Sequence, residues 1–176
     1  MELQLIARNA ISIHTSANRV WDLLTNPAWA KGYMCGFQVQ SQWKKGSEIV
    51  FRGVEEDGGD IVVGRGVILN NFPLQLLEFS LFEPHLGLSD MFENETIVTY
   101  HLQRKGLNET LLSVQQGDFS VGENGQQRFD IAQQRWNCIL PKIKAMAERE
   151  YVQAIELTTP SFIEHSDADV SYNSLF

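Results

Sequence analysis

The sequence predicts an α+β fold in which a curved antiparallel sheet of about six to seven strands grips a long C-terminal helix. Three observations support this prediction. Alternating apolar and polar segments fill the middle of the chain, a long segment with helical spacing follows them, and a strand with two short helices precedes them. We expect residues 1–150 to form one domain and residues 151–176 to be an acidic, polar extension.

The N-terminal part reads as one strand followed by the two short helices. Residues 10–14 alternate, with Ile11 and Ile13 on one face, as in a half-buried strand. Ser16 is expected to cap the first helix, because its hydroxyl can accept from the free amides of the first turn. The Asn-Pro pair at 26–27 ends this helix, and a second short helix is expected over residues 29–33.

Further strands are predicted by alternation and by the turns that separate them, over residues 48–55, 61–72, 76–83, 96–103 and 110–116. The Asp-Gly-Gly-Asp segment at 57–60 supplies the positive backbone angles of a tight hairpin. Gly64 and Gly66 are expected to let the sheet bend. Because no helix interrupts the series, neighbouring strands should pair antiparallel through their short connections.

The last regular element has the apolar spacing of one face of a long helix. Its apolar residues lie three, four and seven apart: Phe129, Ala132, Trp136, Ile139, Leu140, Ile143, Met146 and Ala147. Pro141 removes one backbone donor, so we expect a kink near Asn137 or a break followed by another turn. A bend would help the helix to follow a curved sheet.

Composition and charge restrict the partners. The chain has 14 Lys and Arg against 22 Asp and Glu, a net charge of -8, which disfavours nucleic acid and anionic membrane surfaces. No apolar run approaches the ~20 residues of a membrane span, and the first residues lack the features of an export signal, so we expect a cytoplasmic protein. Cys35 and Cys138 lie far apart without a metal-binding spacing, and two reduced thiols are expected.

Several segments also resemble a known family. They are ISIHTSANRVWDLLTNP at 11–27, WKKG at 43–46, GRG at 64–66, VTYHL at 98–102, ETLL at 109–112 and WNCILPKIK at 136–144. In this order they resemble the START-like, or helix-grip, superfamily (SRPBCC), which includes the birch pollen allergen. The similar branch is the one named for homologues of the activator of heat-shock-protein ATPase. The resemblance covers about residues 10–150 and implies a fold with an internal cavity.

The resemblance leaves function open, since members bind lipids, sterols, polyketides or hormones, some catalyse cyclisation, and one branch activates a chaperone ATPase. A curved sheet and one helix cannot close every gap, so the dry faces of both should line a pocket. The candidate ligand-binding residues are Phe51, Phe79, Tyr100, Val114, Phe129 and Trp136, and the alternative for each is an ordinary core side chain. Tyr100 is the best polar candidate, because a buried phenol needs a partner. Gln116 and Gln133 are expected at the surface, with an inward orientation as the alternative.

The connection at 83–95 is expected to be a loop. It contains four apolar residues that should be buried, either over the mouth of the cavity or, the favoured account, against the terminal helix: Leu86, Leu88, Met91 and Phe92. His85, Asp90 and Glu93 share this loop without the spacing of a metal site, so we expect no metal. The GRG segment lacks the third glycine of a dinucleotide loop, and no cofactor is expected.

The leading hypothesis is non-enzymatic binding of a small hydrophobic molecule, because no linear motif combines a nucleophile with an acid or base. A co-chaperone or stress-response module with a chaperone partner is the first alternative, and it predicts an exposed apolar patch without a sizeable cavity. A polyketide-cyclase-type enzyme is the second. It would need Tyr100, His85 or an acid such as Asp90 or Glu93 to converge inside the cavity. A homodimer is left open.

Overall fold

The computed structural model describes residues 4–158, with side chains through residue 149. Its elements in chain order are β1 (Ala7–Ile13), α1 (Ala17–Thr25), α2 (Pro27–Tyr33), β2 (Gln38–Ser41), β3 (Glu48–Val54), β4 (Asp60–Phe72), β5 (Leu76–Leu81), the 3-10 turns η1 (Pro84–Leu86) and η2 (Phe92–Asn94), β6 (Thr96–Gly106), β7 (Glu109–Gly117) and α3 (Gly125–Thr158). These elements confirm the predicted α+β class.

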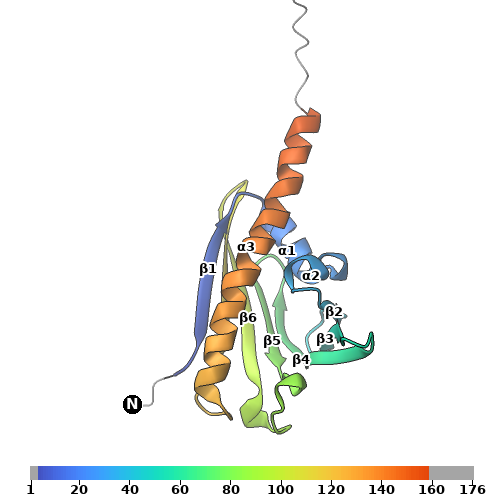
Figure 1. The fold of residues 1–176 in the computed structure, drawn as a ribbon. Coiled ribbons are helices and arrows are strands. Elements are labelled where there is room, and N and C mark those ends of the chain that lie inside the picture. Colours follow the sequence, from blue (N-terminus) through green and yellow to red (C-terminus); the bar gives the residue numbers. More distant parts are fainter. Residues whose placement is uncertain (1–3, 159–176) are drawn as a thin grey trace, which may run out of the picture.

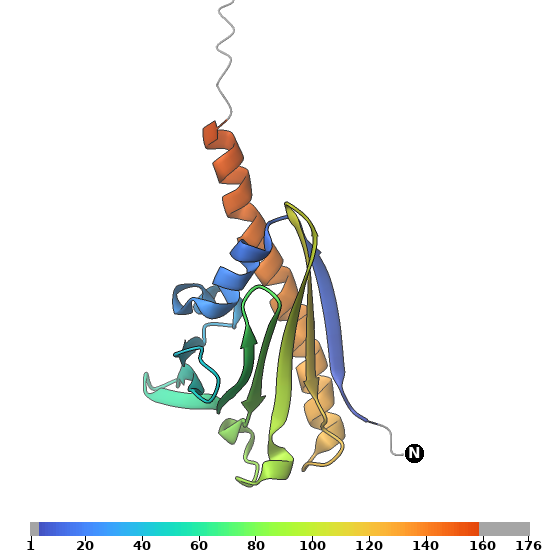
Figure 2. The ribbon, with the colours of Figure 1, turned by 180° about the vertical axis from the view of Figure 1, so that it is seen from behind.

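One antiparallel sheet of seven strands forms the body of the molecule, in the order β1-β7-β6-β5-β4-β3-β2. The sheet curves around α3, and α1 and α2 lie beside the helix on the same side of the sheet (Figure 1). Seen from behind, the strands cover the helix (Figure 2). The first strand closes one edge: Ala7 lies opposite Gln116 of β7, and the Leu5 amide donates to Asp118 Oδ1 at 3.0 Å. This is the predicted helix-grip arrangement.

The two short helices begin and end through side-chain caps. Ser16 Oγ accepts from the Arg19 amide at 3.4 Å, as the sequence predicted. Asn26 ends α1, and its Oδ1 accepts from the Ala28 amide at 3.1 Å, so one residue caps the next helix as well. Pro27 occupies the first turn of α2, where its missing N–H costs nothing. The second helix therefore begins earlier than the expected residue 29.

Close contact at glycine shapes the sheet. A Cβ on Gly66 would lie 1.7 Å from the Ser80 carbonyl oxygen of β5, and one on Gly64 would lie 3.0 Å from Leu81. Register shifts occur nearby, between Phe51 and Arg52 and beyond Ile68. Strands β4 and β5 can thus approach each other only because position 66 lacks a side chain.

The sequence prediction missed β2, a short edge strand.

Helix α3 supplies the other wall of the core. Trp136, Ile139 and Ile143 are buried, whereas Phe129 is half-buried. The helix runs unbroken through Pro141 and bends gently along its length (Figure 1). The expected break is therefore wrong, and the bend agrees with a helix that follows a curved sheet. The helix continues to Thr158, into the segment expected as an extension, and residues 159–176 lie outside the described residues. Within residues 4–158, no helix is long and apolar enough to cross a membrane.

The 83–95 connection is held by polar contacts. Asn94 is 1% exposed; its amide nitrogen donates to Ser89 O at 2.9 Å and to Glu123 Oε1 at 2.8 Å, and its Oδ1 accepts from the Glu123 amide at 2.8 Å. Met91 and Phe92 are 53% and 84% exposed, so their expected burial is wrong. The buried asparagine fixes this loop without help from those side chains.

Candidate functional site

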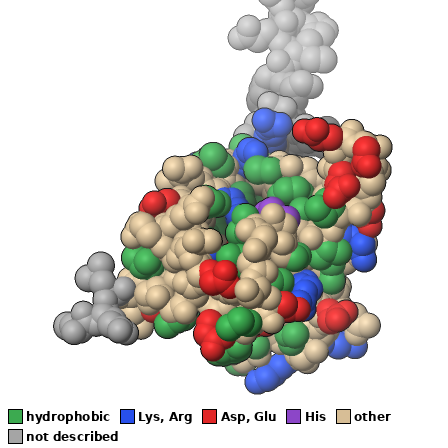
Figure 3. Space-filling model, turned by 60° about the horizontal axis from the view of Figure 1, so that its bottom comes forward, with side chains coloured by type: hydrophobic (Ala, Val, Ile, Leu, Met, Phe, Trp, Pro, Cys, Tyr) green, Lys and Arg blue, Asp and Glu red, His purple; other side chains and the backbone are tan. Residues whose placement is uncertain are grey.

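A cavity of about 120 Å³, open to solvent at one side, lies between the inner face of the sheet and α3. Four of the predicted site residues, Phe51, Phe79, Tyr100 and Trp136, line it. The other wall residues were not predicted as ligand-binding: Met34, Cys35, Phe37, Val63, Gly64, Leu81, Glu83, His85, Val98, Arg135 and Ile139. The face in Figure 3 is hollowed, with hydrophobic, basic and histidine side chains around the hollow.

The other two predicted residues lie elsewhere. Val114 is buried on β7 but does not line this cavity. Phe129 packs edge-on against Phe119, with 6.4 Å between ring centroids, near the start of α3. Inward orientation alone therefore does not place a side chain at the cavity.

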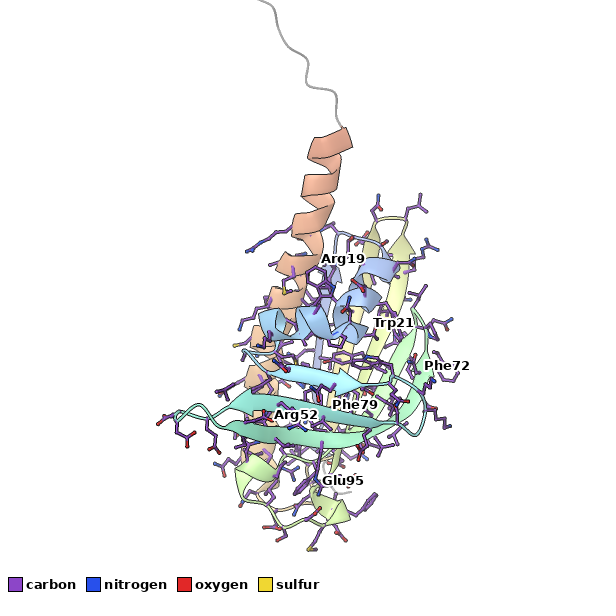
Figure 4. All side chains as sticks on the ribbon, turned by 90° about the vertical axis from the view of Figure 1, so that its right-hand side faces the viewer. Arg19, Trp21, Arg52, Phe72, Phe79 and Glu95 are labelled. Carbon is purple, nitrogen blue, oxygen red and sulfur yellow. The ribbon has the colours of Figure 1, made fainter. Side chains whose placement is uncertain are left out.

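Four aromatic rings form a continuous row along the wall. The ring centroids are 5.9 Å apart between Phe51 and Phe79, 6.2 Å between Phe79 and Tyr100, and 5.7 Å between Tyr100 and Trp136. Figure 4 shows Phe79 within the body of the molecule, whereas Phe72 projects from its edge. Because tilted and edge-on aromatic pairs are favourable, the row gives the cavity one stable apolar side.

Hydrogen bonds fix the orientation of the Trp136 indole. Its Nε1 donates to Gln116 Oε1 at 2.9 Å, and Gln116 Nε2 donates to Thr96 Oγ1 at 3.1 Å. Gln116 is 0% exposed, so its expected place at the surface is wrong. The signal was present in the sequence, because Leu112, Val114 and Gln116 recur with the period of two of one strand face.

The cavity has a polar end, in which the sequence analysis named His85 but missed Glu83 and Arg135. Glu83 Oε1 accepts from Arg135 Nη1 at 2.7 Å, and the two side chains are 7% and 27% exposed. His85 Nδ1 lies 2.7 Å from the Val63 carbonyl oxygen, which can only accept, so Nδ1 carries the proton. The buried acid on this wall is therefore Glu83, which lies just outside the apolar run that ends β5.

The acids proposed earlier stay outside the cavity. Asp90 forms an exposed ion pair with Arg65 at 2.6 Å, and Glu93 is exposed. Among the described residues, no group of three or more His, Cys, Asp or Glu is placed to hold a metal ion. Both cysteines are free, and Cys35 lies at the cavity, 3.6 Å from Lys142 Nζ.

Two tyrosines are buried without a hydrogen-bond partner for their hydroxyls among the described residues, Tyr33 at 3% and Tyr100 at 5% exposure. Burial raises the pKa of both phenols, because desolvation disfavours the phenolate. For Tyr100 the neighbouring Tyr33 raises the pKa further, while Arg135 lowers it. In the folded protein, both phenols therefore remain protonated at pH values well above the usual pKa of tyrosine.

These raised pKa values predict a loss of stability in alkali. The contribution is complete below the unfolded-state pKa of about 10 and is lost as the pH rises from there toward the higher folded-state pKa. The free energy of unfolding should fall by up to about 1.4 kcal/mol per tyrosine for each pH unit in this range. Urea unfolding at about pH 9 and about pH 11 measures it. A variant with both Tyr33→Phe and Tyr100→Phe should show a smaller loss, and an equal loss would refute the assignment.

Comparisons with known proteins agree with this geometry. ChR145 from Cytophaga hutchinsonii, a solution structure, is 31% identical, with 86% of this chain and 99% of that chain covered and a TM-score of 0.69. CalU16 from Micromonospora echinospora is 15% identical, with 82% of each chain covered and a TM-score of 0.60. DynU16, a protein in the dynemicin biosynthetic locus, is 16% identical, with 83% of this chain and 48% of that chain covered and a TM-score of 0.63. The last two show similarity of fold alone.

No curated protein matches the chain. A family model does match, over residues 14–148, which include β3 to β7 and most of α3. Its description is Activator of Hsp90 ATPase homolog 1-like protein. The match agrees with the segments that resembled this branch in the sequence. The chain therefore belongs to the family of Activator of Hsp90 ATPase homolog 1-like proteins.

Proposed function

We propose that the protein binds a small hydrophobic molecule, without catalysing its conversion, in the cavity between the sheet and α3. The observation that supports this proposal is the unfilled space of about 120 Å³ beside the aromatic row from Phe51 to Trp136. Protein interiors are normally packed to the density of organic crystals, so a void of this size beside four rings calls for an occupant. Its mostly apolar wall favours an apolar guest.

The volume of the cavity restricts the size of the ligand. A cavity of about 150 Å³ is known to hold benzene, whereas pockets for drug-sized ligands measure about 300–1,000 Å³. The space of about 120 Å³ suits a molecule with one ring. Sterols and long-chain lipids would require the walls to move apart.

The test is a thermal-shift and NMR titration with one-ring compounds such as toluene, with a sterol as the expected non-binder. A ligand at about ten times its dissociation constant should add about 1.4 kcal/mol to the free energy of unfolding. Val98, which lines the cavity, gives a filling variant, Val98→Met, that should weaken binding. Its neighbour Ile97 is 47% exposed, so Ile97→Met is the matched control and should bind as the unmodified protein does. Failure of every one-ring compound to bind would overturn the proposal.

Chaperone activation is the second candidate, because the family description names it and because Met91 and Phe92 expose apolar surface. A partner surface does not explain the cavity, so we rank it below ligand binding. The enzymatic alternative requires Tyr100, His85 or an acid to converge in the cavity, and Tyr100, His85 and Glu83 do line it, whereas Asp90 and Glu93 do not. We rank it below ligand binding, because Glu83 is already paired with Arg135 and His85 with the Val63 carbonyl oxygen.

A further inference from the structure

We propose that the ligand carries an uncharged oxygen, a hydroxyl or a carbonyl, that accepts a hydrogen bond from Tyr100. This inference rests on the proposed function and specifies the chemistry of the ligand's polar end. It combines two observations, an unused donor in the wall and a cation whose charge is already neutralised.

The unused donor is the Tyr100 hydroxyl. The side chain is 5% exposed and stands between Phe79 and Trp136, with ring centroids at 6.2 and 5.7 Å. No hydrogen bond joins its oxygen to another described residue, and the side chain lines the open space of the cavity. Buried polar groups almost always have a partner, so a hydroxyl placed here needs one from the cavity's occupant. Water can fill this role in the empty cavity, and a ligand that displaces the water must replace its hydrogen bond.

The other donor of the aromatic row, the Trp136 indole N–H, already has a hydrogen-bond partner. It donates to Gln116 at 2.9 Å, and Gln116 in turn donates to Thr96 at 3.1 Å. The indole donor is therefore engaged, and Tyr100 is the donor of the aromatic row that a ligand can reach.

The neutralised cation is Arg135, the cationic residue of the cavity wall. It donates to Glu83 at 2.7 Å, and the Glu83 side chain is only 7% exposed. A carboxylate ligand would have to compete with Glu83 for this guanidinium and would be repelled by the buried carboxylate. A cationic ligand would be repelled by Arg135. A ligand whose polar group is uncharged can bind beside the Glu83–Arg135 ion pair without separating the two charges.

A series of one-ring compounds that differ only in the head tests the inference: toluene, p-cresol and 4-methylbenzoate. Binding is followed by NMR through the Trp136 indole N–H, assigned with Trp136→Phe. We expect p-cresol to bind about three- to tenfold more tightly than toluene. We expect 4-methylbenzoate to bind at least about tenfold more weakly than toluene. In Tyr100→Phe the advantage of p-cresol should vanish, while the affinity for toluene is kept.

Tyr33→Phe is the matched control, because Tyr33 is equally buried and lacks a hydrogen-bond partner among the described residues, but does not line this cavity. It should keep the preference for p-cresol. Equal affinities for toluene and p-cresol would overturn this inference and leave the proposed function intact. A preference that survives in Tyr100→Phe, or tighter binding of 4-methylbenzoate, would also overturn it. If none of the compounds binds, the proposed function itself fails.

Discussion

Gly66→Ala is expected to lower the free energy of unfolding by about 3 kcal/mol, at the upper end for an overpacked site. The new Cβ would lie 1.7 Å from the Ser80 carbonyl oxygen, a backbone atom that cannot rotate away. Strands β4 and β5 would have to separate at the point where the sheet curves. Urea unfolding measures the loss. Weakened ligand binding should accompany it, because Gly64 and Val63 of the same strand line the cavity.

Gly106→Ala is the control for this experiment. Gly106 also lies in a strand of the sheet. A Cβ added there would have the Glu109 Cβ as its nearest neighbour, at 4.0 Å. Its change in stability should be within about 0.5 kcal/mol of zero. Equal effects of the two substitutions would show that close contact with Ser80 does not determine the cost.

Gln116→Leu is expected to lower the free energy of unfolding by about 2–3 kcal/mol. The change removes the acceptor of the Trp136 indole N–H and the donor to Thr96, both in the interior. A buried donor left without a partner costs its full desolvation penalty. Chemical denaturation measures the loss, and the Trp136 indole proton should shift, since its hydrogen bond is gone.

Two further variants make this prediction specific. Gln115 is the adjacent residue on β7 and is exposed, so Gln115→Leu should change stability by less than about 0.5 kcal/mol. Adding Trp136→Phe to Gln116→Leu removes the orphaned indole donor. The double variant should then lose less than the sum of the two single losses. Additive losses would contradict a shared hydrogen bond.

The sequence predicted those parts of the fold that depend on local chemistry. Ser16 caps its helix because a hydroxyl in that position can reach a free amide of the first turn, whatever the rest of the chain does. The glycines at 58 and 59 form the expected turn between β3 and β4, with Gly58 at a φ of 89°. Strand β2 escaped prediction, because its four residues hold a single apolar side chain, Val39, too few to show a period.

The candidate site was predicted only in part, because a cavity is a property of packing. Alternation identified Phe51, Phe79 and Tyr100 as inward residues, and they line the space. Val114 faces inward by the same rule but lies where the core is filled. The ion pair of Glu83 with Arg135 joins a loop to a distant helix, and no local pattern signals such a pair.

The pairing of the first strand with the last affects how the chain folds during its synthesis. Leu5 and Asp118, which join the first strand to the last at one edge of the sheet, are 113 residues apart in sequence. At about 5–20 residues per second, the first strand is synthesised roughly 6 to 23 s before its partner. During this interval β1 lacks its partner strand β7, so this edge of the sheet forms late, and α3 can complete the core only after that.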